Sequence, residues 1–185
     1  MGSGKIGPIL LLVAIGGFLF YLSWKPSSSG IAEEMSVDAA GKITHDGHSY
    51  ETEWGEDRRI EGHLRVKERH YDENLPVITW TFLITTGEYS DPDIVELTSY
   101  GDGNFRWQAP RQPTGSLNGY HLVPATPAAE AALQALDEGD EVVLEGKFSQ
   151  SGRLTSDTGA FVQLTHSNHK FMLLSTAAPG VAPTS

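Results

Sequence analysis

The chain has 185 residues, of which 39% are hydrophobic and 20% are charged, a balance typical of one globular domain with appendages. It contains no cysteine, which excludes disulfide bonds, thiolate metal sites and a cysteine nucleophile. Its formal net charge of −11 argues against nucleic acid as a partner, because proteins that hold phosphates normally neutralise them with Lys and Arg.

The first predicted element is a membrane-spanning helix over residues 6–24, IGPILLLVAIGGFLFYLSW. A helix of this length measures roughly 28 Å, close to the hydrocarbon thickness of a bilayer. Lys5 and Lys25 bracket it, as anchoring residues do at membrane boundaries. A cleaved signal peptide is the alternative, although its apolar region is normally shorter. We expect a single-pass anchor in residues 1–25, in the inner (cytoplasmic) membrane, with the rest of the chain on the periplasmic, extracytoplasmic side.

Three segments are expected after the anchor. Residues 26–37 contain Pro, Ser and Gly and are expected to form a polar linker. Residues 38–175 are expected to fold as one β-rich domain. Residues 176–185 consist mainly of Ala, Pro and Gly without charge, which predicts a disordered tail.

Apolar residues in the domain recur with a period of two, which predicts β-strands. Asp46-Gly47 lies between two short strand-like runs and predicts a type I′ hairpin turn. Residues 60–66 and 78–84 are expected to pair antiparallel, with Ile60, Gly62, Leu64 and Val66 on one apolar face of the first strand. Further strands are expected over residues 104–108, 120–123, 141–148, 160–165 and 171–175.

One helix interrupts the strands. Thr126 offers an N-cap oxygen and Pro127 suits the first helical position, ahead of the sequence AAEAALQAL. A mainly β chain with one short helix before its last strands predicts a small OB-like barrel, and a β-sandwich is the alternative.

The segment 104–148 resembles a stretch in a group of uncharacterised, membrane-anchored bacterial proteins. The residues that carry the resemblance are Phe105, Arg106, Trp107, Pro110, Asn118, His121, Leu122, Pro124, Ala125, Gly139, Asp140, Val142 and Gly146. The resemblance implies the same architecture and a membrane-tethered location. It implies no activity.

Four histidines form two similarly spaced pairs, each around two intervening residues. His45 and His48 flank the predicted turn, and His166 and His169 repeat the spacing. Imidazoles are good ligands for zinc and copper, so the four would form a metal site if the two turns met in space. The alternative is that they are ordinary polar turn residues.

Four other residues are candidates for binding a partner. Arg106 and Trp107 are of the residue types that dominate interface hot spots, and Asn118 and His121 lie in the same resembling segment. A buried imidazole whose ring is hydrogen-bonded is the alternative for His121. The basic residues Arg65, Lys67 and Arg69 are expected on one solvated strand face, which is too small for nucleic-acid binding.

The sequence lacks the phosphate loop, nucleophile elbow and HExxH helix of common enzyme classes, which favours a non-catalytic role. The leading hypothesis is a membrane-tethered interaction or accessory module of an envelope complex, with a protein partner. A metal or haem carrier is the first alternative. Its layout is similar to that of membrane-tethered haem-delivery barrels, but their His-x-x-x-Tyr motif is absent, and no cofactor is expected. A hydrolase with a non-standard site around His121 is the second alternative.

Overall fold

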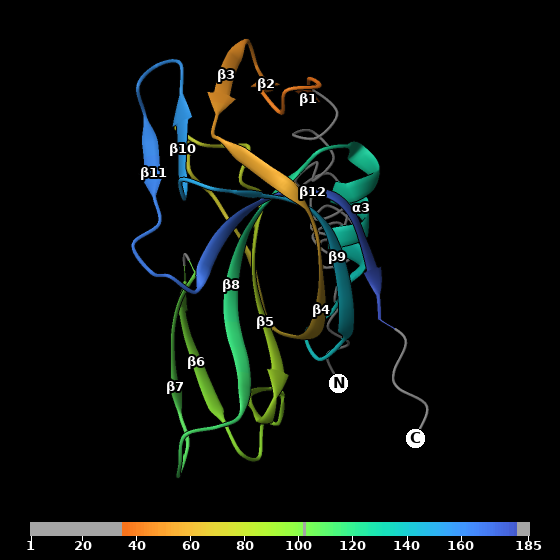
Figure 1. Ribbon diagram of the computed structural model, residues 1–185, viewed down its shortest axis with the longest axis vertical. Coiled ribbons are helices and arrows are strands. Elements are labelled where there is room, and N and C mark those ends of the chain that lie inside the picture. Colours follow the sequence, from red (N-terminus) through yellow and green to blue (C-terminus); the bar gives the residue numbers. More distant parts are fainter. Residues whose placement is uncertain (1–34, 102, 181–185) are drawn as a thin grey trace, which may run out of the picture. The chain divides into compact units, whose positions relative to one another are not determined.

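The fold is described by a computed structural model for residues 35–101 and 103–180 (Figure 1). Within these ranges no helix has the length and apolar character needed to cross a membrane. The predicted anchor, 1–25, and most of the predicted linker, 26–37, lie outside the described residues. The membrane anchor therefore stays a prediction.

Five long strands close into a barrel in the order β12-β8-β5-β4-β9, and β9 pairs with β12 to complete the ring. The β8–β12 pair is parallel, and the other four pairs are antiparallel. The strands are β4 (Trp54–Arg69), β5 (Trp80–Gly87), β8 (Gly115–Pro124), β9 (Glu141–Ser149) and β12 (His169–Pro179). The prediction of a mainly β fold with one short helix is confirmed.

A smaller sheet has the strand order β1-β2-β3-β10-β11. The predicted hairpin turn is present in it, since Asp46 and Gly47 have φ angles of 49° and 77°, as a type I′ turn requires. Figure 1 shows this sheet in orange and light blue above the barrel. Its strands are β1 (Ser36–Val37), β2 (Ile43–His45), β3 (His48–Glu51), β10 (Arg153–Ser156) and β11 (Phe161–Gln163).

The connection from β5 to β8 contains a separate hairpin. The short 3-10 helix η1 (Glu88–Ser90) is followed by β6 (Glu96–Gly101) and β7 (Asn104–Gln108), which pair antiparallel. Figure 1 shows the β6–β7 hairpin alongside β8 and β5. This hairpin forms one wall of the candidate site.

The α-helix α3 (Pro127–Ala135) lies between β8 and β9 and begins where the sequence predicts. The Thr126 hydroxyl accepts a hydrogen bond from the Ala129 backbone N–H at 3.1 Å, which satisfies one of the unpaired donors of the first turn. Ala129 and Leu133 are buried in the barrel core. The helix is therefore held by its apolar side as well as by its cap.

Alternation along β8 and β12 creates two cores. Leu122 and Met172 belong to the cluster inside the barrel, together with Phe82 of β5. Their neighbours Val123 and Leu173 belong to a second cluster with residues of the small sheet. The same two strands thus supply both cores from their opposite faces.

A β-bulge in β4 changes which of its residues share a face of the strand. Leu64 pairs with Ile84, but Val66 pairs with Leu83, so one extra residue lies between them on β4. The bulge reverses the alternation, and Lys67 pairs with the buried Phe82 instead of lying on a solvated face. The expectation that Leu64 and Val66 share one face is therefore wrong.

The C-terminal strand is longer than expected. β12 continues through Pro179, and residues 176–179 pair with β9 after an irregularity between Leu174 and Thr176. Backbone pairing needs no apolar side chain, which is why an Ala-rich segment can complete a sheet. Residues 176–179 therefore belong to the barrel, and 181–185 lie outside the described residues.

Candidate functional site

The centre of the candidate site is His121, on the outer face of β8. Tyr120 and Leu122, its neighbours in the strand, belong to the barrel core, so strand alternation turns the imidazole outward. His121 pairs with Thr81 of β5, and its Nδ1 lies 3.1 Å from the Thr81 Oγ1. Both residues are buried, with 7% and 3% of their surface exposed. The imidazole is therefore fixed on one side by a hydroxyl that solvent does not reach.

The other ring nitrogen of His121 contacts a second histidine. His169 begins β12, which runs parallel to β8 and pairs it with Gly119. The His121 Nε2 lies 3.1 Å from the His169 Nδ1, a hydrogen-bond distance at which one ring carries the proton and the other accepts it. A Cβ at Gly119 would lie only 2.9 Å from the His169 Cε1, so glycine leaves room for the ring.

Two further histidines extend the contact at either end. The ring of His70, just after β4, lies 6.4 Å from that of His121, and the ring of His166 lies 5.6 Å from that of His169. We call His70, His121, His166 and His169 the histidine cluster. Both ring nitrogens of His70 are buried, and neither has a hydrogen-bond partner among the residues that the structure describes, which is a cost to folding.

The histidine cluster favours neutral imidazoles at its centre. Burial lowers the pKa of His121 to about 3, and repulsion from His169 and His70 adds to the effect. Burial also lowers the pKa of His169, with a further contribution from His166. At neutral pH both rings are therefore uncharged and can each donate and accept one hydrogen bond.

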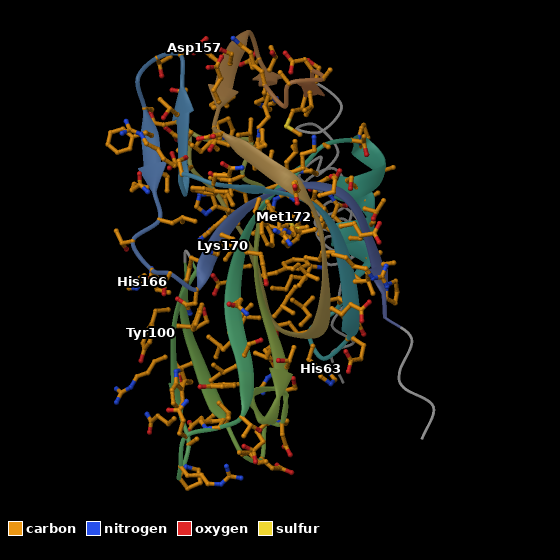
Figure 2. All side chains as sticks on the ribbon, viewed as in Figure 1. His63, Tyr100, Asp157, His166, Lys170 and Met172 are labelled. Atoms are coloured by element: carbon orange, nitrogen blue, oxygen red, sulfur yellow. The ribbon has the colours of Figure 1, made fainter. Side chains whose placement is uncertain are left out.

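A pocket of about 180 Å³ opens beside His169. Phe105 of β7 stacks on the His169 ring, with centroids 5.3 Å apart and planes within 8° of parallel. Figure 2 labels His166 in the loop that leads to β12, on the side of the molecule where the β6–β7 hairpin lies. The lining residues are Gly103, Asn104, Phe105, Trp107, Leu117, His166, Asn168 and His169.

Polar contacts hold the β6–β7 hairpin against the barrel. The Glu68 carboxylate of β4 accepts a hydrogen bond from the Gly103 N–H at 3.1 Å and another from the Ser99 hydroxyl. A Cβ at Gly103 would lie 2.9 Å from the His121 Cε1, so this position also needs glycine. The hairpin and the histidine cluster therefore pack as one unit.

The predicted partner-binding residues lie on different faces of their strands. Trp107 lines the pocket and meets Tyr89 edge to face at 5.4 Å. The His121 ring contacts His169, which lines the same pocket. Arg106 is exposed on the alternate face of β7, and Asn118 pairs with the core residue Ile84 on the alternate face of β8. The structure therefore brings Trp107 and His121 to one site and Arg106 and Asn118 to other faces.

The predicted metal-binding residues also divide. His45 and His48 are direct cross-strand partners in the β2–β3 hairpin. His45 is buried, whereas His48 is exposed and its Nδ1 lies at hydrogen-bond distance, 3.2 Å, from the Asp157 Oδ1. Among residues 35–101 and 103–180, no three His, Asp or Glu side chains are grouped so that they could hold a metal ion. His166 and His169 belong instead to the histidine cluster.

Sequence reasoning did not place His70, Thr81 or Phe105 at this site. Phe105 was recognised only through the resemblance, and His70 and Thr81 carry no local signal. The alternation of β8 offers a partial signal, because it separates His121 from the core residues on either side. Pairing of β8 with β12 across 48 residues of sequence is needed to bring His169 to His121.

No protein-family model matches this chain, and comparison with curated proteins gives no significant match.

Proposed function

We propose that this chain is a membrane-tethered, non-catalytic interaction module, an accessory subunit of an envelope complex. Residues 6–24 anchor it in the cytoplasmic membrane, and the β-domain lies on the extracytoplasmic side. The anchor is supported by the apolar character of the segment and the lysines at its two ends.

The domain is OB-like in this proposal. Five strands form a closed barrel, and the single α-helix of the described residues lies between the third and fourth barrel strands, β8 and β9. OB-fold barrels bind their ligands on the face of the second and third strands and with the adjoining loops. In this chain those strands are β5 and β8.

The observation that carries the proposal is the position of the histidine cluster and its pocket. Thr81 and His121 lie on the outer face of β5 and β8, where an OB-like barrel binds ligands. His70 comes from the loop after β4, and His166 from the segment that precedes β12. Residues distant in sequence thus converge on the face where OB-fold barrels bind their ligands.

The same geometry favours binding over catalysis. The Thr81 hydroxyl that contacts His121 belongs to a residue that is 3% exposed, so a substrate has no access to that pair. Among the described residues, those that line the pocket include no carboxylate, and the pKa of His121 at about 3 leaves it a poor proton carrier at neutral pH.

Three basic residues in the second half of β4, Arg65, Lys67 and Arg69, are engaged within the domain, which supports a partner other than nucleic acid. Arg65 donates to the backbone carbonyls of Tyr89 and Val95 at 2.6 and 3.0 Å. Lys67 donates to the Gln134 carbonyl at 2.9 Å, and Arg69 forms an ion pair with Glu130 at 2.5 Å. These cations serve the fold, and a phosphate backbone would have to compete for them.

Affinity purification of the tagged full chain from membranes of the cells that produce it tests the proposal. We expect a defined, stoichiometric partner to co-purify with the wild-type protein and to be lost with His166→Ala, which alters the exposed edge of the site. His48→Ala is the matched control, because it makes the same change on the distant β2–β3 hairpin. Recovery of the wild-type chain alone, or a partner retained equally by His166→Ala, would contradict the proposal.

A further inference from the structure

The pocket beside His169 has the chemistry of a site for a neutral, hydroxyl-rich ring. We propose that it binds one ring of an uncharged sugar. The inference deepens the proposed function, on which it rests for the location of the binding face. Four features of the lining support it: charge, apolar surface, hydrogen-bonding capacity and size.

Among the residues that the structure describes, the lining includes no Lys, Arg, Asp or Glu. Burial lowers the pKa of His169, which keeps its imidazole neutral at pH 7. The Glu68 carboxylate of β4, which contacts the β6–β7 hairpin, is already bound to the Gly103 N–H and the Ser99 hydroxyl. A charged ligand would lose hydration here without gaining a counter-charge, so the pocket selects against one. The net charge of the chain also repels anionic ligands.

Aromatic surface meets polar groups in the lining. Phe105 and Trp107 lie on the same face of β7, since they alternate with the exposed Arg106. The π face of an aromatic ring is negatively polarised and attracts the weakly positive C–H groups that cover one side of a sugar ring. An uncharged sugar therefore suits this pair better than a purely polar ligand would.

The side-chain amides of the lining donate hydrogen bonds within the domain through their nitrogens. Their oxygens remain to accept hydrogen bonds from a ligand. The Asn104 Nδ2 donates to the Gly101 carbonyl at 3.2 Å, and the Asn168 Nδ2 donates to the Leu117 carbonyl at 3.4 Å. The His169 Nδ1 is engaged with His121, so its Nε2 is the remaining polar atom of that ring. A ligand that both donates and accepts, as sugar hydroxyls do, satisfies this set.

The size of the pocket limits the ligand to a single ring. Its volume of about 180 Å³ lies below the 300–1,000 Å³ typical of pockets that enclose drug-sized molecules. A longer glycan would place one residue in the pocket and continue over the surface, as oligosaccharides do on OB-fold barrels.

The test uses the full chain in lipid nanodiscs, because many mild detergents carry sugar headgroups. The wild-type protein is applied to an array of neutral oligosaccharides, including cellotriose, maltotriose and triacetylchitotriose, and positive glycans are titrated by calorimetry. We expect saturable binding of at least one of them. Trp107→Ala and Asn104→Ala should each weaken it at least tenfold.

Arg106→Ala is the matched control, since Arg106 adjoins Trp107 on the alternate face of β7, and its affinity should equal that of the wild type. Asn104 is exposed, so Asn104→Ala keeps the test valid if Trp107→Ala does not fold. The absence of saturable binding, or binding retained by Asn104→Ala and any folded Trp107→Ala, would overturn the sugar site. A protein partner lost with His166→Ala but no bound glycan would overturn this inference alone. A bound glycan with no co-purifying partner would overturn only the accessory-subunit proposal.

Discussion

The surroundings of His121 determine the protonation state of its ring. Its ring lies between the Thr81 hydroxyl and the His169 imidazole, and both contacts suit a neutral ring. Protonation would place a charge in a buried site already next to two further histidines. Protonation of His121 at low pH should therefore destabilise the packing of the site.

The stability of the domain should fall on mild acidification. The folded-state pKa of His121 is about 3, whereas an unfolded histidine titrates near 6.5. Below pH 6.5 the unfolded chain binds a proton that the folded chain does not, so the free energy of unfolding decreases by up to about 1.4 kcal/mol per pH unit. Above pH 6.5 both states are neutral and this contribution is constant. Urea denaturation at pH 7.5 and pH 5.0 measures the difference.

His121→Gln is the control for this pH dependence, because glutamine keeps polar atoms but does not titrate. Its unfolding free energy should change less between the two pH values than that of the wild type. The low pKa of Glu88, about 2, affects stability only as pH falls below 4.5, outside this window. If the unfolding free energy changes equally between pH 7.5 and pH 5.0 in wild type and variant, His121 is not the titrating group.

Gly119→Ala should disturb the site through a single methyl group. The added Cβ would lie 2.9 to 3.1 Å from three atoms of the His169 ring, which must move away from His121. We expect a loss of about 1–3 kcal/mol in unfolding free energy, typical of overpacking. Gly55→Ala is the control in β4, where the new methyl meets the flexible Gln150 side chain, with an expected change within about 0.5 kcal/mol. Equal midpoints of urea denaturation for the two variants would contradict the packing described here.

At the scale of elements, α3 is held to the barrel by a buried carboxylate. Glu130 accepts hydrogen bonds from Arg69 at 2.5 Å, Thr79 at 2.8 Å and Trp80 at 3.2 Å. The Arg69 guanidinium also lies over the Trp80 ring, 4.8 Å from its centroid. One helix residue thus satisfies polar groups from both β4 and β5.

Glu130→Ala should be among the most destabilising single substitutions. It would leave the Arg69 charge, which is 17% exposed, and the Thr79 hydroxyl without their carboxylate partner. We expect a loss of about 3–5 kcal/mol in unfolding free energy, as for other broken buried ion pairs. Thermal unfolding followed by circular dichroism measures it. Arg59→Ala, which removes an exposed pair with Glu61 and Glu145, should have little effect, and a similar loss in both variants would refute the special role of Glu130.

Some features of the secondary structure were predicted from the sequence, and others were not. The hairpin turn at Asp46-Gly47 and the helix start at Thr126 follow from local chemistry, and both are present. The bulge between Leu64 and Val66 was not predicted, because a one-residue offset depends on the partner strand. The pairing of residues 176–179 was missed for the same reason, since it lies in backbone bonds to β9.

At the scale of the molecule, two cores share two strands. β8 contributes Leu122 to the barrel core and Val123 to the outer one, and β12 contributes Met172 and Leu173 in the same way. Loss of either core would expose one face of both strands. The barrel and the small sheet should therefore unfold together.

Fluorine NMR of the full chain labelled with 5-fluorotryptophan tests this cooperativity. Trp80 packs against the barrel core and Trp54 against the outer core, so they report on the two separately. We expect their native resonances to disappear at the same urea concentration, with assignments from single Trp→Phe variants. Loss of the Trp54 resonance well before that of Trp80 would show that the small sheet unfolds independently.

The sequence by itself determined the class of fold, the start of the helix, the hairpin turn and the expectation of an apolar anchor. These features depend on residues within a few positions of one another, whose periodicity and turn chemistry act locally. The tertiary structure alone decided which histidines meet. His121 and His169 contact each other because β8 and β12 pair in parallel, while His45 and His48 stay in their own hairpin. Such contacts depend on strand register between distant segments, which local side-chain chemistry does not specify.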